Sequence, residues 1–89
     1  MKIGELQWDD ENIEHIGSHG IAPSEVEDVC FGPHINYPAR YGRYLVYGKT
    51  YHGKYIRVVL ERLYGITFRP KTSYPMTESE KKKYRKRIK

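Results

Sequence analysis

Hydrophobic residues concentrate in two segments in the middle of the chain, at positions 43–50 and 55–62. Both segments are rich in β-branched and aromatic side chains, which favour extended strands. The four residues between them include Gly53 and predict a hairpin turn. Because successive side chains of a strand point to opposite faces, the second segment should have one buried face. This face is predicted to consist of Ile56, Val58 and Leu60.

A third strand is predicted at 66–69, after a short break that contains glycine. The alternation predicts that Ile66 and Phe68 lie in the core and that their neighbours lie on the opposite face. Pro70 indicates a sheet edge or a bulge, so the alternation predicts no side-chain direction beyond it. The face opposite the core, called the outer face below, is then predicted to carry Arg57, Glu61, Thr67 and Arg69.

Two short acidic helices are predicted before these strands, after a short strand within residues 2–8. Asp9 can cap the first helix, and Gly20 can take the left-handed conformation that ends it. Pro23 suits the first turn of the second helix. A further short strand is predicted within 34–40, between two prolines. The helices are expected to bury Ile13, Ile16, Val26, Val29, Cys30 and Phe31.

The C-terminal residues 77–89 predict a basic helix. Thr77 and Glu80 match a capping box, in which each side chain accepts a hydrogen bond from the other residue's backbone. Only Tyr84 and Ile88, four residues apart, offer an apolar stripe. Two interpretations stay open for this loosely anchored helix: a solvated basic tail, or a helix that contacts phosphate groups directly.

These elements predict an α+β fold. We expect a small antiparallel sheet of about four strands, with two N-terminal helices on one face and a basic C-terminal helix. A chain of 89 residues has room for one domain, residues 1–89. A single cysteine excludes an internal disulfide and a cysteine-based zinc cluster. Without a signal-peptide-like or membrane-spanning apolar run, the sequence favours a cytoplasmic protein.

Charge is divided unevenly along the chain, although the formal net charge is only +5. Residues 1–39 hold eight acidic residues and one lysine, whereas residues 40–76 hold eight basic residues and one glutamate. Residues 77–89 add seven bases and two acids. Such segregation can attract nucleic acid or an acidic protein partner, or the two halves can complement each other within one fold.

The histidines give no sign of a metal or cofactor site. His15 and His19 have the spacing of two zinc ligands on a helix, but no third ligand accompanies them. Structural or solvent-facing roles are therefore favoured for this pair. His34 and His52 lie in predicted loops, from which either could reach a substrate as a general base, but no partner that would orient them is evident. We predict no metal and no cofactor.

Several short motifs follow one another along nearly the whole chain. They are Trp8-Asp9, Asn12, His19-Gly20-Ile21, Glu25, Val29, Arg43-Tyr44-Leu45-Val46, Gly48, Thr50, Gly53, Val58-Val59, Arg69-Pro70, Met76-Thr77, Glu80 and Tyr84. No one of these motifs is specific. The ordered set resembles the BrnT-type ribonuclease toxins.

The resemblance implies the RelE/ParE-type architecture, with two helices on one face of a small antiparallel sheet. It also implies a ribonuclease that inhibits translation by cleaving RNA, free or ribosome-associated. Neutralisation by a BrnA-like antitoxin is implied as well, and the toxin–antitoxin complex of this family represses its own operon. Both a homo-oligomer and a heterotetramer with the antitoxin are compatible with this pattern.

One position departs from the family pattern. Many members carry Ser-Ala-Arg shortly before the Met-Thr pair, and here the equivalent residues are Thr72, Ser73 and Tyr74. A tyrosine can stack on a base or donate a proton to an oxyanion. It cannot supply the fixed charge and bidentate fork of a guanidinium group.

Cleavage through attack of the ribose 2′-hydroxyl needs a base, cations for the phosphorane and an acid for the leaving oxygen. We expect phosphate stabilisation from Arg57 and Arg69, the base from Glu61, and the acid or stacking group from Tyr74. Glu61 could instead pair only with an arginine on the next strand. The RNA-binding candidates are Arg43, Lys49, Lys71 and Tyr84.

Two alternatives from other functional classes remain open. The same basic face could bind RNA or the ribosome without catalysis, or the protein could be a toxin that binds a protein target. An antitoxin is expected to dock on the basic sheet face or on the C-terminal helix, because acidic segments would be attracted there.

Overall fold

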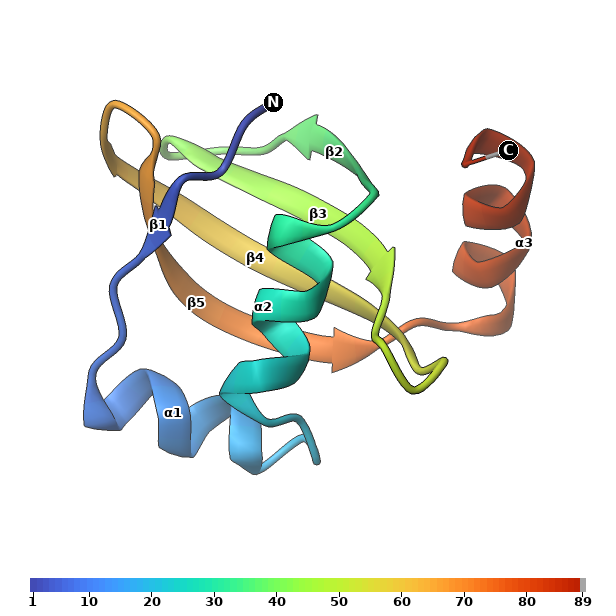
Figure 1. The fold of residues 1–89 in the computed structure, drawn as a ribbon, viewed down its shortest axis with the longest axis horizontal. Coiled ribbons are helices and arrows are strands. Elements are labelled where there is room, and N and C mark those ends of the chain that lie inside the picture. The colour runs from blue at the N-terminus through green and yellow to red at the C-terminus, as the bar shows by residue number, and fades with distance from the viewer. Residues whose placement is uncertain (89) are drawn as a thin grey trace.

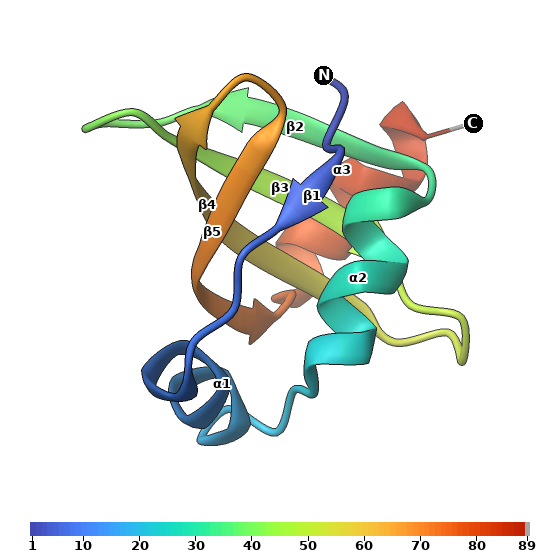
Figure 2. The same ribbon diagram turned by 60° about the vertical axis from the view of Figure 1, so that its left-hand side comes forward.

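A mixed five-stranded sheet forms the centre of the molecule in the computed structural model, which describes residues 1–88 (Figure 1). Helices α1 and α2 cover one face of the sheet, and α3 lies across the other (Figures 1 and 2). The elements, in chain order, are β1 (Glu5–Leu6), α1 (Asp10–Gly17), α2 (Pro23–Phe31), β2 (His34–Pro38), β3 (Arg43–Lys49), β4 (Tyr55–Tyr64), β5 (Thr67–Pro75) and α3 (Glu78–Arg87).

Strands β2 to β5 form an antiparallel meander, and the strand order in the sheet is β1-β5-β4-β3-β2. The expectation of about four antiparallel strands was too low by one and missed a parallel pair. Strand β1 joins the edge next to β5 in parallel, with Glu5 opposite Thr67. The backbone N–H of Gly4 donates to the carbonyl of Ile66, and that of Gln7 to the carbonyl of Phe68. This pairing joins segments far apart in the sequence, so the local pattern gave no signal of its direction.

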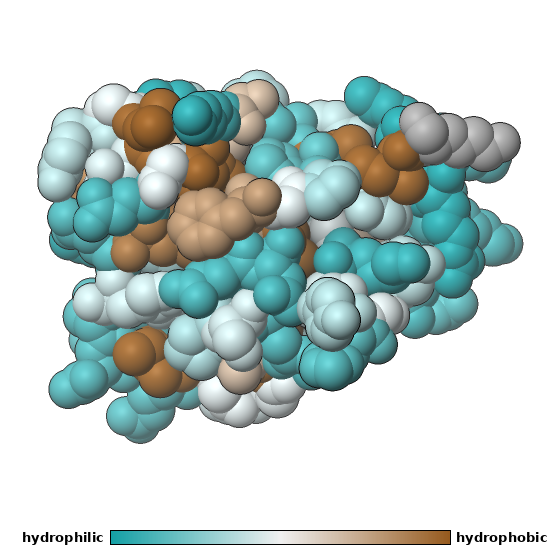
Figure 3. All heavy atoms as spheres, in the orientation of Figure 1, coloured by the Kyte–Doolittle hydropathy of each residue, from teal (hydrophilic) through white to brown (hydrophobic). Residues whose placement is uncertain are grey.

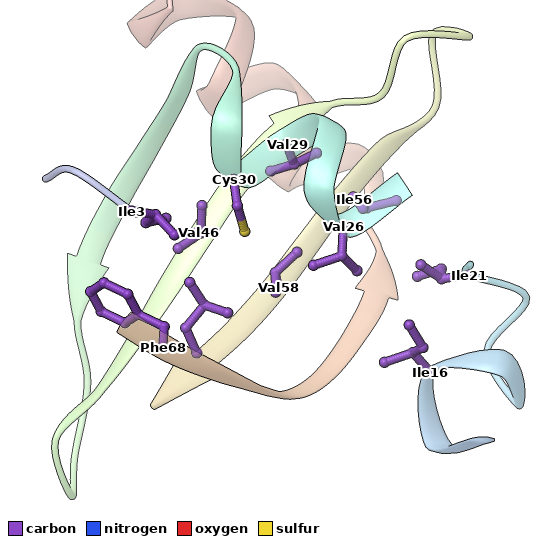
Figure 4. Packing of buried hydrophobic residues seen from close by; sticks show 11 residues of the cluster. Ile3, Ile16, Ile21, Val26, Val29, Cys30, Val46, Ile56, Val58 and Phe68 are labelled. Carbon is purple, nitrogen blue, oxygen red and sulfur yellow. The ribbon is translucent and has the colours of Figure 1, made fainter. Parts of the chain in front are cut away.

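The core lies between the inner face of the sheet and helices α1 and α2 (Figure 4). The strand alternation is confirmed here, because Ile56, Val58, Leu60 and Phe68 are completely buried. Gly48 of β3 lies directly beneath α2. A Cβ atom at this position would meet Cγ1 of Val29 at 2.7 Å, so glycine allows the helix to approach the sheet closely.

Four side chains differ from their predicted burial. Ile66 is 46% exposed, and Thr67, expected on the outer face, is buried. The β4–β5 register is irregular between Arg62 and Tyr64, so strand β5 begins one residue later than the alternation assumed. Ile66 instead lies in the turn against Gly4. The predictions for Ile13 and Phe31 were also wrong, because these helix residues are 39% and 53% exposed.

The helix starts follow the predicted capping signals, whereas α1 ends at Gly17, three residues before Gly20. Asp9 accepts a hydrogen bond from the backbone N–H of Asn12 at 2.8 Å, and Pro23 occupies the first turn of α2. The α3 capping box is formed, with Thr77 and Glu80 bonded to each other's backbone N–H at 3.1 and 2.9 Å. Within residues 1–88, no helix has both the length and the apolar character needed to cross a membrane.

Candidate nucleic-acid interface

The charge division of the sequence becomes a division between the two faces of the molecule. Helices α1 and α2 carry six acidic residues, and Figure 3 shows hydrophilic side chains over the lower part of this face and a hydrophobic patch at its upper left. The basic residues lie mainly on strands β3 to β5 and on α3. The outer face is therefore the side of the sheet with the stronger attraction for a polyanion.

Two rows of charged and aromatic side chains cross the outer face. In the first row, Glu61 of β4 pairs in register with Arg43 of β3 and Arg69 of β5. The carboxylate of Glu61 lies 3.8 Å from Nη1 of Arg69, with both side chains partly exposed. The ion pair considered for Glu61 is thus present, and the first row combines one carboxylate with two guanidinium groups.

In the second row, Arg57 of β4 pairs in register with Tyr47 of β3 and Tyr74 of β5. The Arg57 guanidinium carbon lies 5.1 Å from the centre of the Tyr74 ring, and Nη1 lies 3.1 Å from the Glu80 carboxylate of α3. The Tyr47 hydroxyl donates to the same carboxylate at 3.4 Å. Burial raises the pKa of Tyr47, so this phenol stays protonated at neutral pH.

The four candidate catalytic residues therefore form two pairs rather than one cluster. Arg57 and Glu61 are four residues apart on one strand, which corresponds to roughly 13 Å between their Cα atoms. Arg57 lies next to Tyr74, and Glu61 lies next to Arg69. A phosphate group that contacts one pair can also contact the other pair only if the side chains of that second pair extend toward it.

Unsatisfied polar groups lie in and between the rows. Among the residues that the structure describes, Nε of Arg43, Nε of Arg57 and Oγ1 of Thr72 are shielded from solvent and have no hydrogen-bond partner. Thr72 pairs with Val59 in the strand position between the two rows. Leaving such a group unpaired costs about 1–3 kcal/mol, which a bound anion could offset.

The proposed RNA-binding residues do not lie together. Arg43 belongs to the first row, and Lys49 lies at the other end of β3, 5.8 Å from the Tyr55 ring centre. Tyr84 is almost buried, with its ring 5.8 Å from that of Tyr55, and it holds α3 against the sheet. Lys71 occupies a bulge and lines a depression on the α1 side, away from the two rows.

The fold can now be compared with known proteins. No protein-family model and no curated protein sequence matches the chain. Among solved structures, it is similar to the 1.1 Å crystal structure of the ribonuclease toxin BrnT from Brucella abortus. The TM-score is 0.68 at 14% sequence identity, and the alignment covers 83% of this chain and 97% of that chain.

The chain has the fold of a BrnT-type toxin. The α+β fold expected from the sequence resemblance is thereby confirmed, although the sheet has five strands and one parallel pair. At this level of identity the likeness concerns the fold, so the roles of individual residues depend on the geometry of the outer face.

Two residues of this BrnT-type fold join the site without having been predicted there. Glu80 was predicted as a helix cap and belongs to the motif set, yet its carboxylate also pairs with Arg57. His19 was considered structural or solvent-facing, yet its ring lies 4.5 Å from that of Tyr74. Neither contact has a local sequence signal, because both join elements that are distant along the chain.

The remaining histidines lie apart from the two rows. His15 contacts His19 edge to face at 5.4 Å, and Nδ1 of His34 lies 3.0 Å from the carbonyl oxygen of Gly32. His52 lies in the exposed turn before β4. Within residues 1–88, no three His, Cys, Asp or Glu side chains gather in a way that could hold a metal ion.

Proposed function

We propose that this protein is the toxin of a type II toxin–antitoxin pair and that it cleaves RNA without a metal ion. The observation that carries the proposal is the outer face, where two arginine-containing rows hold unsatisfied polar groups on a fold similar to that of a ribonuclease toxin. The guanidinium groups suit phosphate oxygens, because they offer planar, permanently charged donors.

The reaction assigned to this face begins with attack of a ribose 2′-hydroxyl on the adjacent phosphorus. Glu61 takes the hydroxyl proton, and the P–O5′ bond breaks to leave a 2′,3′-cyclic phosphate. Arg69, which lies next to Glu61, stabilises the charge that develops on the phosphorane, and Arg57 of the neighbouring row joins it with an extended side chain. Tyr74 donates a proton to the leaving 5′-oxygen or stacks on a neighbouring base. Arg43 and Lys49 bind the backbone on either side.

Tyr74 has neighbours that suit either of its two roles. The Arg57 guanidinium lies over its ring and favours a stacked arrangement, and the adjacent His19 ring extends the aromatic surface. The positive charge of Arg57 also attracts the negative charge left on the Tyr74 oxygen after proton donation. The tyrosine thus fits the position where many BrnT-type toxins carry arginine, although it brings no charge of its own.

A cleavage assay with purified protein tests this proposal. A labelled RNA should be cut to products with 2′,3′-cyclic phosphate ends, an RNA with 2′-deoxyribose at the cut site should stay intact, and EDTA should leave the rate unchanged. Arg69→Ala should abolish cleavage, whereas Arg40→Ala, at an exposed arginine of the β2–β3 turn, should not. Cleavage of the deoxy substrate or loss of activity in EDTA contradicts the mechanism.

Non-catalytic binding of RNA or the ribosome is the second candidate function. The Glu61–Arg69 ion pair favours it, because the only carboxylate of the first row is already engaged by a guanidinium group. Under this alternative, wild-type protein binds RNA without cutting it, and Glu61→Ala leaves the affinity unchanged or higher. A toxin directed at a protein target would show neither cleavage nor salt-sensitive RNA binding.

The proposal includes a BrnA-like antitoxin as partner. The toxin and the antitoxin would form a heterotetramer, or the toxin would form a homo-oligomer. An acidic antitoxin segment would be attracted to the outer face or to α3, where the basic residues lie. Binding there should compete with RNA. Antitoxin that binds the acidic α1–α2 face and leaves RNA affinity unchanged contradicts this docking site.

A further inference from the structure

A cleft of about 320 Å³ opens between helix α3 and the outer side of strands β2 and β3. The cleft lies beside the second row, because they share Tyr47. Glu80, which also lines the cleft, accepts hydrogen bonds from Arg57 and from the Tyr47 hydroxyl. The cleft is close to the lower limit of small-ligand sites, which are mainly apolar with a few polar groups. It is lined by Ile35, Tyr37, Tyr47, Glu80, Lys83 and Tyr84.

The aromatic rings of this cleft are held in place at their hydroxyl ends. Nη1 of Arg87 donates to the Tyr37 hydroxyl at 2.9 Å, and the Tyr47 hydroxyl donates to Glu80 at 3.4 Å. The Tyr37 and Tyr47 rings meet edge to face, with centroids 5.9 Å apart and an interplanar angle of 78°. Both side chains are only half-buried. The chain thus supplies a pre-formed aromatic surface beside the cleft, with the guanidinium carbon of Arg87 5.6 Å from the centre of the Tyr37 ring.

The charges around the cleft indicate what it would hold. Lys83 lies at its border, and α3 as a whole carries six basic residues against two acids. Arg57, proposed above as a phosphate ligand, lies behind Glu80. An occupant with a flat uncharged part and flanking negative charges matches this arrangement. Single-stranded nucleic acid has this character, since its bases stack on aromatic side chains while its phosphates follow the cations.

We propose that this cleft binds one nucleobase of single-stranded RNA, which stacks on the face of Tyr37 and meets the Tyr47 ring edge to face. The inference rests on the proposed function in that it takes RNA as the ligand of the outer face, but it does not require cleavage. The base in the cleft belongs to a nucleotide next to the phosphate held by Arg57. Lys83 contacts the backbone on the other side.

The proposal is tested with a short fluorescent 2′-O-methyl RNA, which lacks the attacking hydroxyl and therefore reports binding alone. Tyr37→Leu should weaken binding roughly 5- to 150-fold, as expected for the loss of one stacked base. Tyr37→Phe keeps the ring and should bind like the wild type. Tyr51→Leu is the matched control, because Tyr51 is 86% exposed in the β3–β4 turn, away from the cleft.

Salt dependence separates stacking from charge. Tyr37→Leu should lower the affinity at every salt concentration without changing the slope of log K against log salt. Lys83→Ala should reduce that slope by about 0.7, the loss of one phosphate contact. Lys82→Ala, at the neighbouring helix position outside the cleft lining, should have a smaller effect.

Equal effects of Tyr37→Leu and Tyr51→Leu would overturn the proposal. So would a loss in Tyr37→Phe as large as in Tyr37→Leu, because the hydroxyl contact with Arg87 would then be responsible. If Tyr37→Leu does not fold, NMR titration of wild-type protein with nucleoside monophosphates replaces it. Shifts confined to β2, β3 and α3 support the cleft, and shifts elsewhere contradict it.

The result is distinguishable from the test of catalysis. If RNA binding depends on the Tyr37 ring but natural RNA is not cleaved, the proposed nuclease activity is refuted and the proposed base site is not. Cleavage with no dependence of binding on Tyr37 would refute the base site alone. An antitoxin peptide that occupies the cleft while RNA binding ignores every cleft variant would also refute it.

Discussion

Replacing Glu61 with glutamine distinguishes a catalytic base from a simple ion-pair partner, because the two roles differ in the size of their effects. The substitution removes the negative charge and keeps the side-chain volume. Glu61 and Arg69 are 3.8 Å apart, with side chains that are 30% and 39% exposed. A pair this accessible contributes about 0.2–1 kcal/mol to stability. The free energy of unfolding should therefore fall by at most about 1 kcal/mol, which is a shift in Tm of about 4–8 °C or less.

A catalytic base has a much larger effect on the reaction. General-base catalysis contributes about 10²–10⁴-fold, which corresponds to about 2.7–5.4 kcal/mol in the activation barrier. Even the lower limit exceeds the contribution of the ion pair. A loss of at least 100-fold in cleavage rate, with a change in stability of at most about 1 kcal/mol, identifies Glu61 as the base.

The assay combines single-turnover cleavage under saturating protein with thermal unfolding of each variant. Arg69→Gln and the double variant complete a cycle that measures the coupling of the pair. Glu78→Gln is the matched control, since Glu78 pairs with Lys81 at 3.0 Å on α3 and is 84% exposed. Cleavage by Glu61→Gln within a few-fold of the wild-type rate refutes the assignment and leaves Glu61 as an ion-pair partner only.

Three further predictions concern single residues. Glu80→Gln keeps the helix cap but removes the carboxylate charge that neutralises Arg57. The affinity for RNA, and the slope of log K against log salt, should therefore rise in a salt titration, and a lower affinity argues against a phosphate role for Arg57. Gly48→Ala brings a methyl group against Val29 and should cost about 1–3 kcal/mol in denaturant unfolding, and an unchanged midpoint contradicts the close packing. Burial raises the pKa of Cys30 to about 12, so a thiol reagent at about pH 8 should label it only after unfolding; rapid labelling of folded protein disproves this.

Much of the secondary structure could be predicted because its signals are local. Asp9, Pro23 and the Thr77–Glu80 pair mark helix starts through contacts within one turn. The alternation in β4 likewise identified the buried and outer faces correctly. These features depend on residues close together in the sequence, where the pattern carries the information.

The errors occurred where distant segments decide the structure. The parallel partner of β1 and the displaced start of β5 depend on pairing across the sheet, so Ile66 and Thr67 exchanged their expected environments. The bulge after Pro70 adds one residue to β5. It turns Lys71 toward α1 and returns Tyr74 to the outer face.

The candidate site shows the same limit. Strand alternation brought Arg57, Glu61 and Arg69 to one face, but it could not show that they form two pairs with different partners. The contacts of His19 with Tyr74 and of Glu80 with Arg57 depend on how α1 and α3 pack on the sheet. No spacing within either helix predicts such a contact.

Mapping of RNA ends after induced expression tests the central claim most directly. Wild-type protein should arrest growth and produce new RNA ends at defined positions. Arg69→Ala, present at the same level and folded, should allow growth and produce none of these ends. Growth arrest with intact RNA would contradict the ribonuclease and would direct attention to a protein target instead.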